Sequence, residues 1–150
     1  MKTIAIVMTA LILFITHAQA KDSTSLQYKD VIKQYKGDVI YLDFWASWCT
    51  PCRKSFPWMN KIQQKYADKN FKVISVNLDA EPNLAKQFLA STPANFTILY
   101  DPDGSLAEEL QLKGMPSSFI INAEGKIVSA HVGFTDKKKV NYEQEIEQLL

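Results

Sequence analysis

The most informative segment of the sequence reads DFWASWCTPCRKSFP, from Asp43 to Pro57. It overlaps a run of β-branched and aromatic residues, DVIYLDFW (38–45), which is apolar on both faces and predicts a strand buried inside a sheet. A helix is expected to follow over 50–67. The only two cysteines of the chain, Cys49 and Cys52, stand where the strand gives way to this helix.

Two thiols at this spacing can pair with each other, share a metal ion or remain idle. A disulfide between them would close a very short loop, which restricts the unfolded chain little, so stabilisation is a weak reason for the pair. A structural zinc site needs four ligands, and the sequence offers no second cysteine pair. Two thiolates can still hold copper, so a copper-handling protein remains an alternative to a redox protein.

The first twenty residues, MKTIAIVMTALILFITHAQA, differ from the rest of the chain. A single lysine precedes an apolar stretch as long as the hydrophobic region of a signal peptide. Ala18-Gln19-Ala20 fits the small-residue cleavage pattern. We therefore expect a signal peptide over 1–20 and a mature domain over 21–150. Export to the periplasm follows from this prediction, and retention of the segment as a membrane anchor is the alternative.

The composition limits the number of domains and the classes of function that are expected. The chain has 150 residues, 47% of them hydrophobic, and a formal net charge of +1. That length suits one domain with a substantial core. Because no strong basic field is present, nucleic-acid binding is not expected.

Beyond the cysteines, strand and helix patterns alternate along the chain. Strands are expected over 71–79 and 96–101, a hairpin over 117–134, and helices over 25–36, 82–91, 105–112 and 136–150. This order predicts an α/β domain in which helices cover both faces of a mixed central sheet.

The position of the cysteines favours redox chemistry. Cys49 falls at a helix N-terminus, where unpaired N–H groups and the helix dipole stabilise a thiolate. Such thiols have pKa values of roughly 3.5–7.5 instead of about 8.5. Cys52 lies one turn further on, so its sulfur can attack a mixed disulfide formed at Cys49 and release the product. No organic cofactor is then required, because the pair itself carries the electrons.

Asp43 is the second unusual residue. A carboxylate within an apolar strand is costly unless it has a partner or a task. Burial should raise its pKa, which suits it to accept a proton from Cys52. We therefore predict that Asp43 assists the resolving step.

With these residues in view, DFWASWCTPCR resembles the active-site stretch of the thioredoxin superfamily, and KSFPWMNKIQQKY resembles its exported TlpA/ResA-type branch. The resemblance extends over essentially the whole mature chain, including GMPSSFIINAEGKIV (114–128). It implies a thioredoxin fold with a helix-strand insertion over about 82–104. It also implies that Asp43 is the buried acid that thioredoxins carry on their central strand.

The same resemblance assigns the substrate contacts. Pro116 would be the cis-proline beside the catalytic pair, and Met115 would hydrogen-bond the backbone of the substrate. Trp48 would flank Cys49 and offer an apolar surface to the substrate. The partners implied are proteins with disulfides or thiols and a membrane thiol-disulfide electron donor, and the domain is expected to be a monomer.

Two departures from the branch bear on the direction of electron flow. Relatives often carry an acidic residue where this chain has Ser55, and Thr50-Pro51 replaces the Gly-Pro of thioredoxin between the cysteines. The resemblance favours a reductase of protein disulfides, in some relatives acting on apocytochrome c during cytochrome c maturation. A disulfide-donating oxidase, an isomerase and a copper-handling thioredoxin-fold protein remain alternatives.

Overall fold

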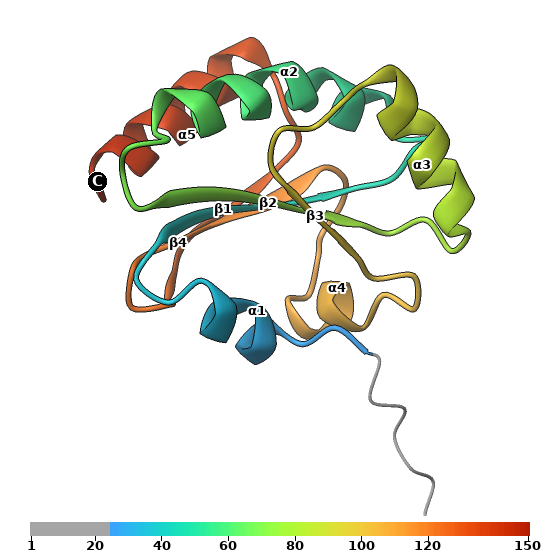
Figure 1. Cartoon of the computed structure of the whole chain (residues 1–150), viewed down its shortest axis with the longest axis horizontal. Helices are drawn as coiled ribbons and strands as arrows, with labels where there is room; N and C mark the ends of the chain where they lie inside the picture. Colours follow the sequence, from blue (N-terminus) through green and yellow to red (C-terminus); the bar gives the residue numbers. More distant parts are fainter. Residues whose placement is uncertain (1–24) are drawn as a thin grey trace, which may run out of the picture.

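A computed structural model describes residues 25–150 of the chain. The predicted signal peptide and the first residues of the predicted mature domain lie outside this range. Five strands form one mixed sheet between two layers of helices, as the sequence predicts (Figure 1). In chain order the elements are α1 (Tyr28–Gln34), β1 (Val39–Trp45), α2 (Thr50–Lys65), β2 (Phe71–Asn77), α3 (Pro82–Ser91), β3 (Thr97–Tyr100), α4 (Ser105–Glu109), β4 (Ser117–Ile121), β5 (Ile127–Val132) and α5 (Asp136–Glu147).

The strands lie in the order β3-β2-β1-β4-β5. β1 pairs parallel to β2 and antiparallel to β4, so it has a neighbour on each side. All seven of its residues are buried, which explains its continuous apolar run. The predicted insertion consists of α3 and β3, and it adds β3 in parallel to the free edge of β2.

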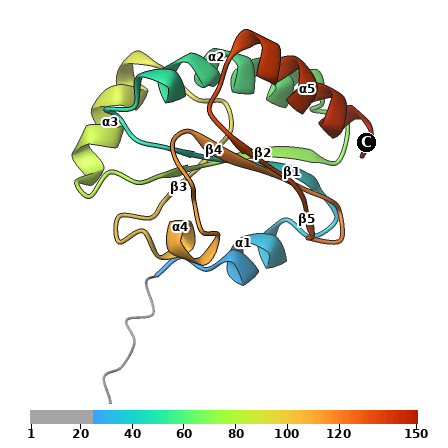
Figure 2. The same ribbon diagram turned by 180° about the vertical axis from the view of Figure 1, so that it is seen from behind.

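The two faces of the sheet carry separate cores. α2, α3 and α5 cover one face, and α1 and α4 cover the other (Figures 1 and 2). Side chains alternate along β1 between these layers. Tyr41 and Trp45 pack with the first layer, whereas Leu42 and Phe44 pack with the second.

An aromatic cluster fixes the first half of α2 on the sheet. The ring of Phe56 lies against Trp45 and Phe88, with centroids 4.9 Å apart in both pairs, and 5.5 Å from Phe96. Phe56 is fully buried. The helix that follows the cysteines is therefore anchored near its start.

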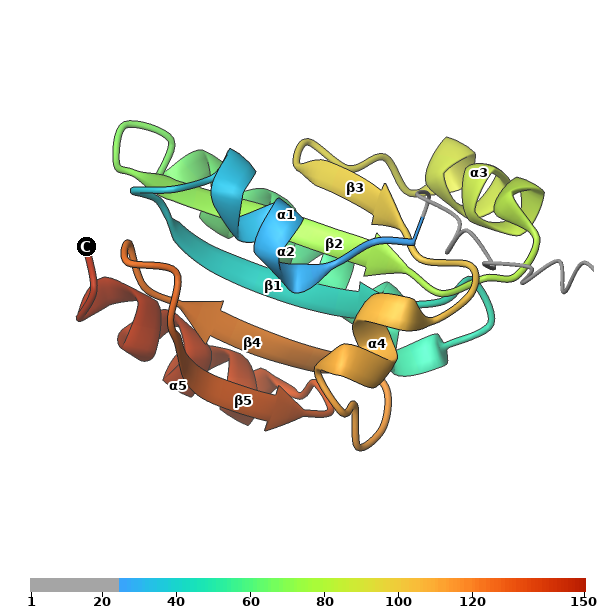
Figure 3. The same ribbon diagram turned by 90° about the horizontal axis from the view of Figure 1, so that it is seen from below.

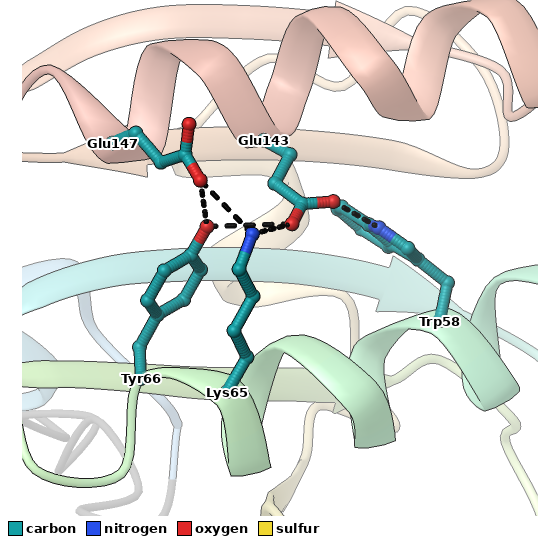
Figure 4. Close-up of polar contacts among 5 residues, drawn as sticks. All are labelled: Trp58, Lys65, Tyr66, Glu143 and Glu147. Atoms are coloured by element: carbon teal, nitrogen blue, oxygen red, sulfur yellow. Dashed lines mark hydrogen bonds and ion pairs between the residues drawn. The ribbon is translucent and has the colours of Figure 1, made fainter.

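The far end of α2 is joined to α5 by polar contacts instead (Figure 4). Lys65 forms ion pairs with Glu143 and Glu147, and the Tyr66 hydroxyl donates to Glu147 at 2.8 Å. The Trp58 indole donates to Glu143 at 3.4 Å. The Lys65 side chain is half exposed, so its ion pairs are screened by solvent.

A buried carboxylate organises α4. Asp101 accepts hydrogen bonds from the Ser105 hydroxyl at 3.0 Å and from the Ala107 backbone N–H at 3.0 Å. The Ser105 hydroxyl also lies 3.1 Å from the carbonyl oxygen of Leu26, so its single proton is shared between the two acceptors, and the Tyr28 N–H donates to Glu109. α4 is therefore held by Asp101, which directly follows β3, and by the start of the described chain, and Figure 3 shows α1 and α4 on the same face.

The observed elements match the predicted ones in kind and order, but most are shorter. α1 covers only the middle of the predicted 25–36 helix, and α4 ends at Glu109 instead of 112. Gln111 has a positive φ of 52°, which is incompatible with continuing the helix. Hydrophobic periodicity reports which side of a segment is buried, and it continues past the last helical hydrogen bond.

The aromatic cluster gives a prediction for stability. Phe56→Ala should lower the free energy of unfolding by about 3–5 kcal/mol, because it leaves a cavity among rings that cannot close over it. Lys65→Met is the matched control on the same helix and should change stability little, since its charge is screened. Urea denaturation followed by circular dichroism measures both. Equal losses in the two variants would contradict this account of the core.

Candidate redox site

The cysteines occupy the junction between β1 and α2. Cys49 is the N-cap of α2 and forms a disulfide with Cys52, with Cα atoms 5.3 Å apart. The Cys52 N–H points at the Cys49 sulfur, at 3.4 Å, and the Arg53 N–H donates to the Cys49 carbonyl at 3.2 Å. The N-terminal end of the helix dipole is therefore directed at Cys49, as its position in the sequence predicts.

The two sulfurs are not equally accessible. Cys52, in the first turn of α2, is fully buried, whereas Cys49 is 4% exposed. Trp48 is 70% exposed, and Thr50 and Pro51 are also exposed. An approaching partner therefore meets Cys49 first.

The sheet topology explains why the residues before β4 meet the cysteines. β4 runs antiparallel to β1, and Ser117 pairs with Phe44, so the start of β4 lies at the edge where β1 ends. The Met115–Pro116 peptide bond just before it is cis, which confirms the expected isomer. The Gly133 N–H donates to the Pro116 carbonyl at 2.7 Å and holds this turn against β5.

An apolar groove runs past Cys49. It has a volume of about 660 Å³ and combines the residues around the disulfide with the end of β2, α4 and the cis-proline turn. Its lining residues are Trp48, Cys49, Thr50, Pro51, Leu78, Ala107, Leu112, Gly114 and Met115. Of the predicted substrate contacts, Trp48 and Met115 line the groove, while Pro116 is buried next to Met115.

Asp43 lies inside the protein, on the face of β1 that α2 covers. Its exposure is 1%, and its hydrogen-bond partner is the Ser75 hydroxyl, which donates to Oδ2 at 3.0 Å. Burial raises the pKa of the Asp43 carboxyl to about 8, against the lowering effect of the Ser75 hydrogen bond. Within residues 25–150 no hydrogen bond joins the carboxyl to Cys52 while the disulfide is closed.

Ser55, the position that departs from the resemblance, is fully buried. Its hydroxyl donates to the Cys52 carbonyl at 2.7 Å, one turn back along α2. The serine therefore satisfies its own polar atom within the helix and adds no charge beneath the disulfide. No carboxylate at position 55 therefore adds a second negative charge to the buried layer that contains Asp43.

Sequence reasoning missed Asp79, which fixes the loop before the cysteines. Its buried carboxylate accepts from the Ser47 hydroxyl at 2.9 Å and the Ser47 N–H at 3.0 Å. The Asn77 amide donates to the same carboxylate at 2.8 Å. The available signal was a carboxylate two residues after β2, because β1 and β2 are parallel and end at the same edge of the sheet.

A metal site was the other possibility for the thiols. Among residues 25–150, no group of three or more His, Cys, Asp and Glu side chains lies close enough together to hold a metal ion. In the same range, no helix has the length and apolar character needed to cross a membrane.

Comparisons with known proteins agree with this geometry. The Redoxin family model matches residues 15–150. Thiol-disulfide oxidoreductase ResA of Bacillus thuringiensis subsp. konkukian (strain 97-27) is 30% identical over 118 residues, which are 78% of this chain and 68% of that protein. Thioredoxin-like protein YneN of Bacillus subtilis (strain 168) is 34% identical over 79% of this chain and 71% of its own length.

A solved structure is more similar in sequence. A protein from Chlorobium tepidum, assigned as a thiol:disulfide interchange protein DsbE, is 50% identical. The match has a TM-score of 0.77 and covers 79% of this chain and 84% of that one. The thioredoxin-type fold, the paired cysteines at the start of α2 and these relatives together show that the chain belongs to the Redoxin family, as a ResA-type thiol-disulfide oxidoreductase.

Proposed function

We propose that this protein is a reductase of disulfides in exported proteins. The observation that supports disulfide exchange is the unequal placement of the two sulfurs. Cys49 lines an open apolar groove, and Cys52 is enclosed behind it. This arrangement suits a nucleophile that meets the substrate and a second thiol that releases it.

The reaction begins from the reduced pair. The Cys49 thiolate attacks one sulfur of a substrate disulfide, that S–S bond breaks, and the displaced substrate thiolate takes up a proton. A mixed disulfide then joins Cys49 to the substrate. The Cys52 thiol loses its proton and attacks the Cys49 sulfur, which releases the second substrate thiolate. Two electrons and two protons reach the substrate, and the Cys49–Cys52 disulfide remains.

Asp43 is the proposed base for the second step. Its pKa of about 8 lies near that of an ordinary thiol, about 8.5, so a proton passes between the two groups with little free-energy cost. The carboxyl and Cys52 belong to the same layer between β1 and α2. Ser75 holds the carboxyl in place through its hydrogen bond.

The substrate lies in the groove beside Cys49. Trp48 and Met115 contact it, and Pro116 sets the position of Met115 through the cis turn. Because the groove lining is largely apolar, it suits the apolar residues next to a substrate cysteine.

The direction of electron flow and the cellular setting rest on the ResA relatives. In this proposal, residues 1–20 direct export, residues 21–150 act as a monomer in the periplasm, and a membrane thiol-disulfide protein returns the electrons. The heme-binding cysteines of apocytochrome c are the proposed substrate, which makes this a cytochrome c maturation factor. Unchanged cytochrome c assembly in a strain that lacks the gene would count against that substrate.

The two cysteines should respond differently to substitution. Cys49→Ser should abolish disulfide reduction, because it removes the sulfur that forms the mixed disulfide. Cys52→Ser should trap that intermediate, which appears as thiol-sensitive high-mass bands on a non-reducing gel. Trapping by Cys49→Ser and not by Cys52→Ser would reverse the roles of the two residues.

Asp43→Asn should slow the release of substrate from the mixed disulfide by about 10²-fold near pH 8, where the wild-type carboxyl begins to ionise and can accept the proton that an amide cannot. In the wild type this rate should rise as the pH passes about 8, where the carboxyl ionises. Stopped-flow measurement of release against pH tests both points. Equal rates in the two proteins at every pH would remove Asp43 from the mechanism.

The same substitution has an opposite effect on stability. Between about pH 4 and 8 the folded protein holds a proton on Asp43 that the unfolded chain has lost, so stability falls as the pH rises through this window. Asp43→Asn removes this dependence and should stabilise the protein at neutral pH. Denaturation at pH 4 and pH 8 measures the change, and an unaltered pH dependence in the variant would contradict the assigned pKa.

The reduction potential of the pair decides the direction. Equilibration with glutathione buffers should give a value near that of thioredoxin, about −270 mV, if the protein is a reductase. A value near −120 mV would make it an oxidase instead. Tight Cu(I) binding by a reduced pair that reduces disulfides poorly would favour the copper-handling alternative.

A further inference from the structure

A second groove lies between α2 and the start of α5, outside the redox groove. It has a volume of about 530 Å³. The rings of Trp58 and Phe134 lie in it with their centroids 5.5 Å apart. Three lysines, Lys54, Lys61 and Lys139, also line it. The groove therefore combines two aromatic rings with several cationic side chains.

The charge of this groove comes mainly from α2. The helix contains Arg53, Lys54, Lys61 and Lys65 but no acidic residue. Lys54, Trp58, Lys61 and Lys65 follow one another at intervals of three or four residues, which places them along one side of the helix, where α5 lies.

The four cations of α2 differ in their partners. Lys65 is paired with Glu143 and Glu147 of α5, as Figure 4 shows, and the Arg53 guanidinium lies 5.5 Å above the ring of Phe88. Within residues 25–150, neither Lys54 nor Lys61 forms an ion pair. The acidic residues of α5 thus neutralise one end of the lysine row and leave the groove end positive.

The start of α5 adds to this positive charge. The N-terminus of α5, capped by Thr135, lies at the groove, so the positive end of the helix dipole is located there. Asp136 is the one acidic residue in the lining, and it is paired with Lys139. The charge of Lys54 also helps to lower the pKa of Asp136, after the larger effect of Lys139, but one carboxylate among three lysines leaves the groove with a net positive charge for an external anion.

A backbone hydrogen bond links one wall of the groove to the cis-proline turn of the redox site. Phe134 directly follows Gly133, whose N–H donates to the Pro116 carbonyl at 2.7 Å. Along α2, the groove lysines lie about 8–18 Å from Cys49 at 1.5 Å per residue. A polypeptide with a cysteine at Cys49 spans that distance with about three to five extended residues.

We propose that this groove is a docking site for an acidic segment of the protein that exchanges disulfides at Cys49. The segment presents carboxylates to Lys54 and Lys61 and an apolar or aromatic side chain to Trp58 and Phe134. This assignment rests on the proposed function and adds the chemistry of the substrate to it. A concave groove lined by aromatic rings suits an inserted side chain. Adsorption to an anionic membrane would instead require a flat or convex basic surface.

The test compares peptide disulfides as substrates. Each peptide places a cysteine about four residues from a segment of two glutamates on each side of a phenylalanine, and glutamine replaces glutamate in the matched peptide. At low salt, the acidic peptide should have a kcat/KM about five-fold higher, the size expected for two partly exposed ion pairs. The advantage should shrink with added salt, because these charges are solvent-accessible.

Variants locate the effect. Lys54→Glu/Lys61→Glu should abolish or invert the preference for the acidic peptide. Lys33→Glu/Lys36→Glu makes the same change of net charge at the end of α1, on the opposite face of the sheet, and should keep the preference. Neutral hydroxyethyl disulfide, which is too small to reach the groove, should be reduced equally by all three proteins.

Three outcomes would overturn the proposal. Equal kcat/KM for the two peptides in the wild type would show that the groove does not bind the acidic segment. An equal loss of preference in both double variants would show the same. Binding to anionic phosphatidylserine vesicles that depends on Lys54 and Lys61, without any peptide preference, would assign the lysines to a membrane. Failure of every protein to reduce hydroxyethyl disulfide would instead contradict the disulfide reductase function itself.

Discussion

The site depends on the central position of β1 between a parallel and an antiparallel neighbour. The parallel pairing brings the ends of β1 and β2 to one edge, where Asp79 reaches Ser47. The antiparallel pairing brings the beginning of β4 to the same edge, and with it Pro116. A shift of one residue in either register would turn the buried side chains of a strand to the opposite face. The hydrophobic cores therefore maintain the geometry around the disulfide.

Local signals predicted much of this arrangement. The cysteine pair, the buried strand with Asp43 and the proline before a strand each occupy a short stretch, so a motif can reveal them. Asp79 was missed because its partner Ser47 lies 32 residues away, and neither residue is unusual alone. The groove wall was missed for the same reason, since Ala107 and Leu112 approach Cys49 only after the sheet has formed. The ends of α1 and α4 were misplaced because apolar periodicity does not mark the last helical hydrogen bond.

Two opposite uses of charge lie on the same side of the sheet. Asp43 is enclosed in a largely apolar layer with the Ser75 hydroxyl as its hydrogen-bond partner, and this burial favours the neutral carboxyl and raises its pKa toward that of a thiol. The lysines of the second groove remain in contact with water, where their charge acts at a distance and can be screened by salt. In the mechanism proposed above, the first placement serves proton transfer after a partner has bound. The second serves the choice of partner before any bond is exchanged.

The connection of α4 to the beginning of the described chain has a consequence for how specificity can evolve. One wall of the redox groove is held by Asp101 from within, and by Leu26 and Tyr28 from a distant part of the sequence. Substitutions near residue 26 can therefore reshape the surface that meets a substrate without touching either cysteine. In this fold the preference for a substrate protein can change during evolution while the disulfide exchange at the cysteines stays the same.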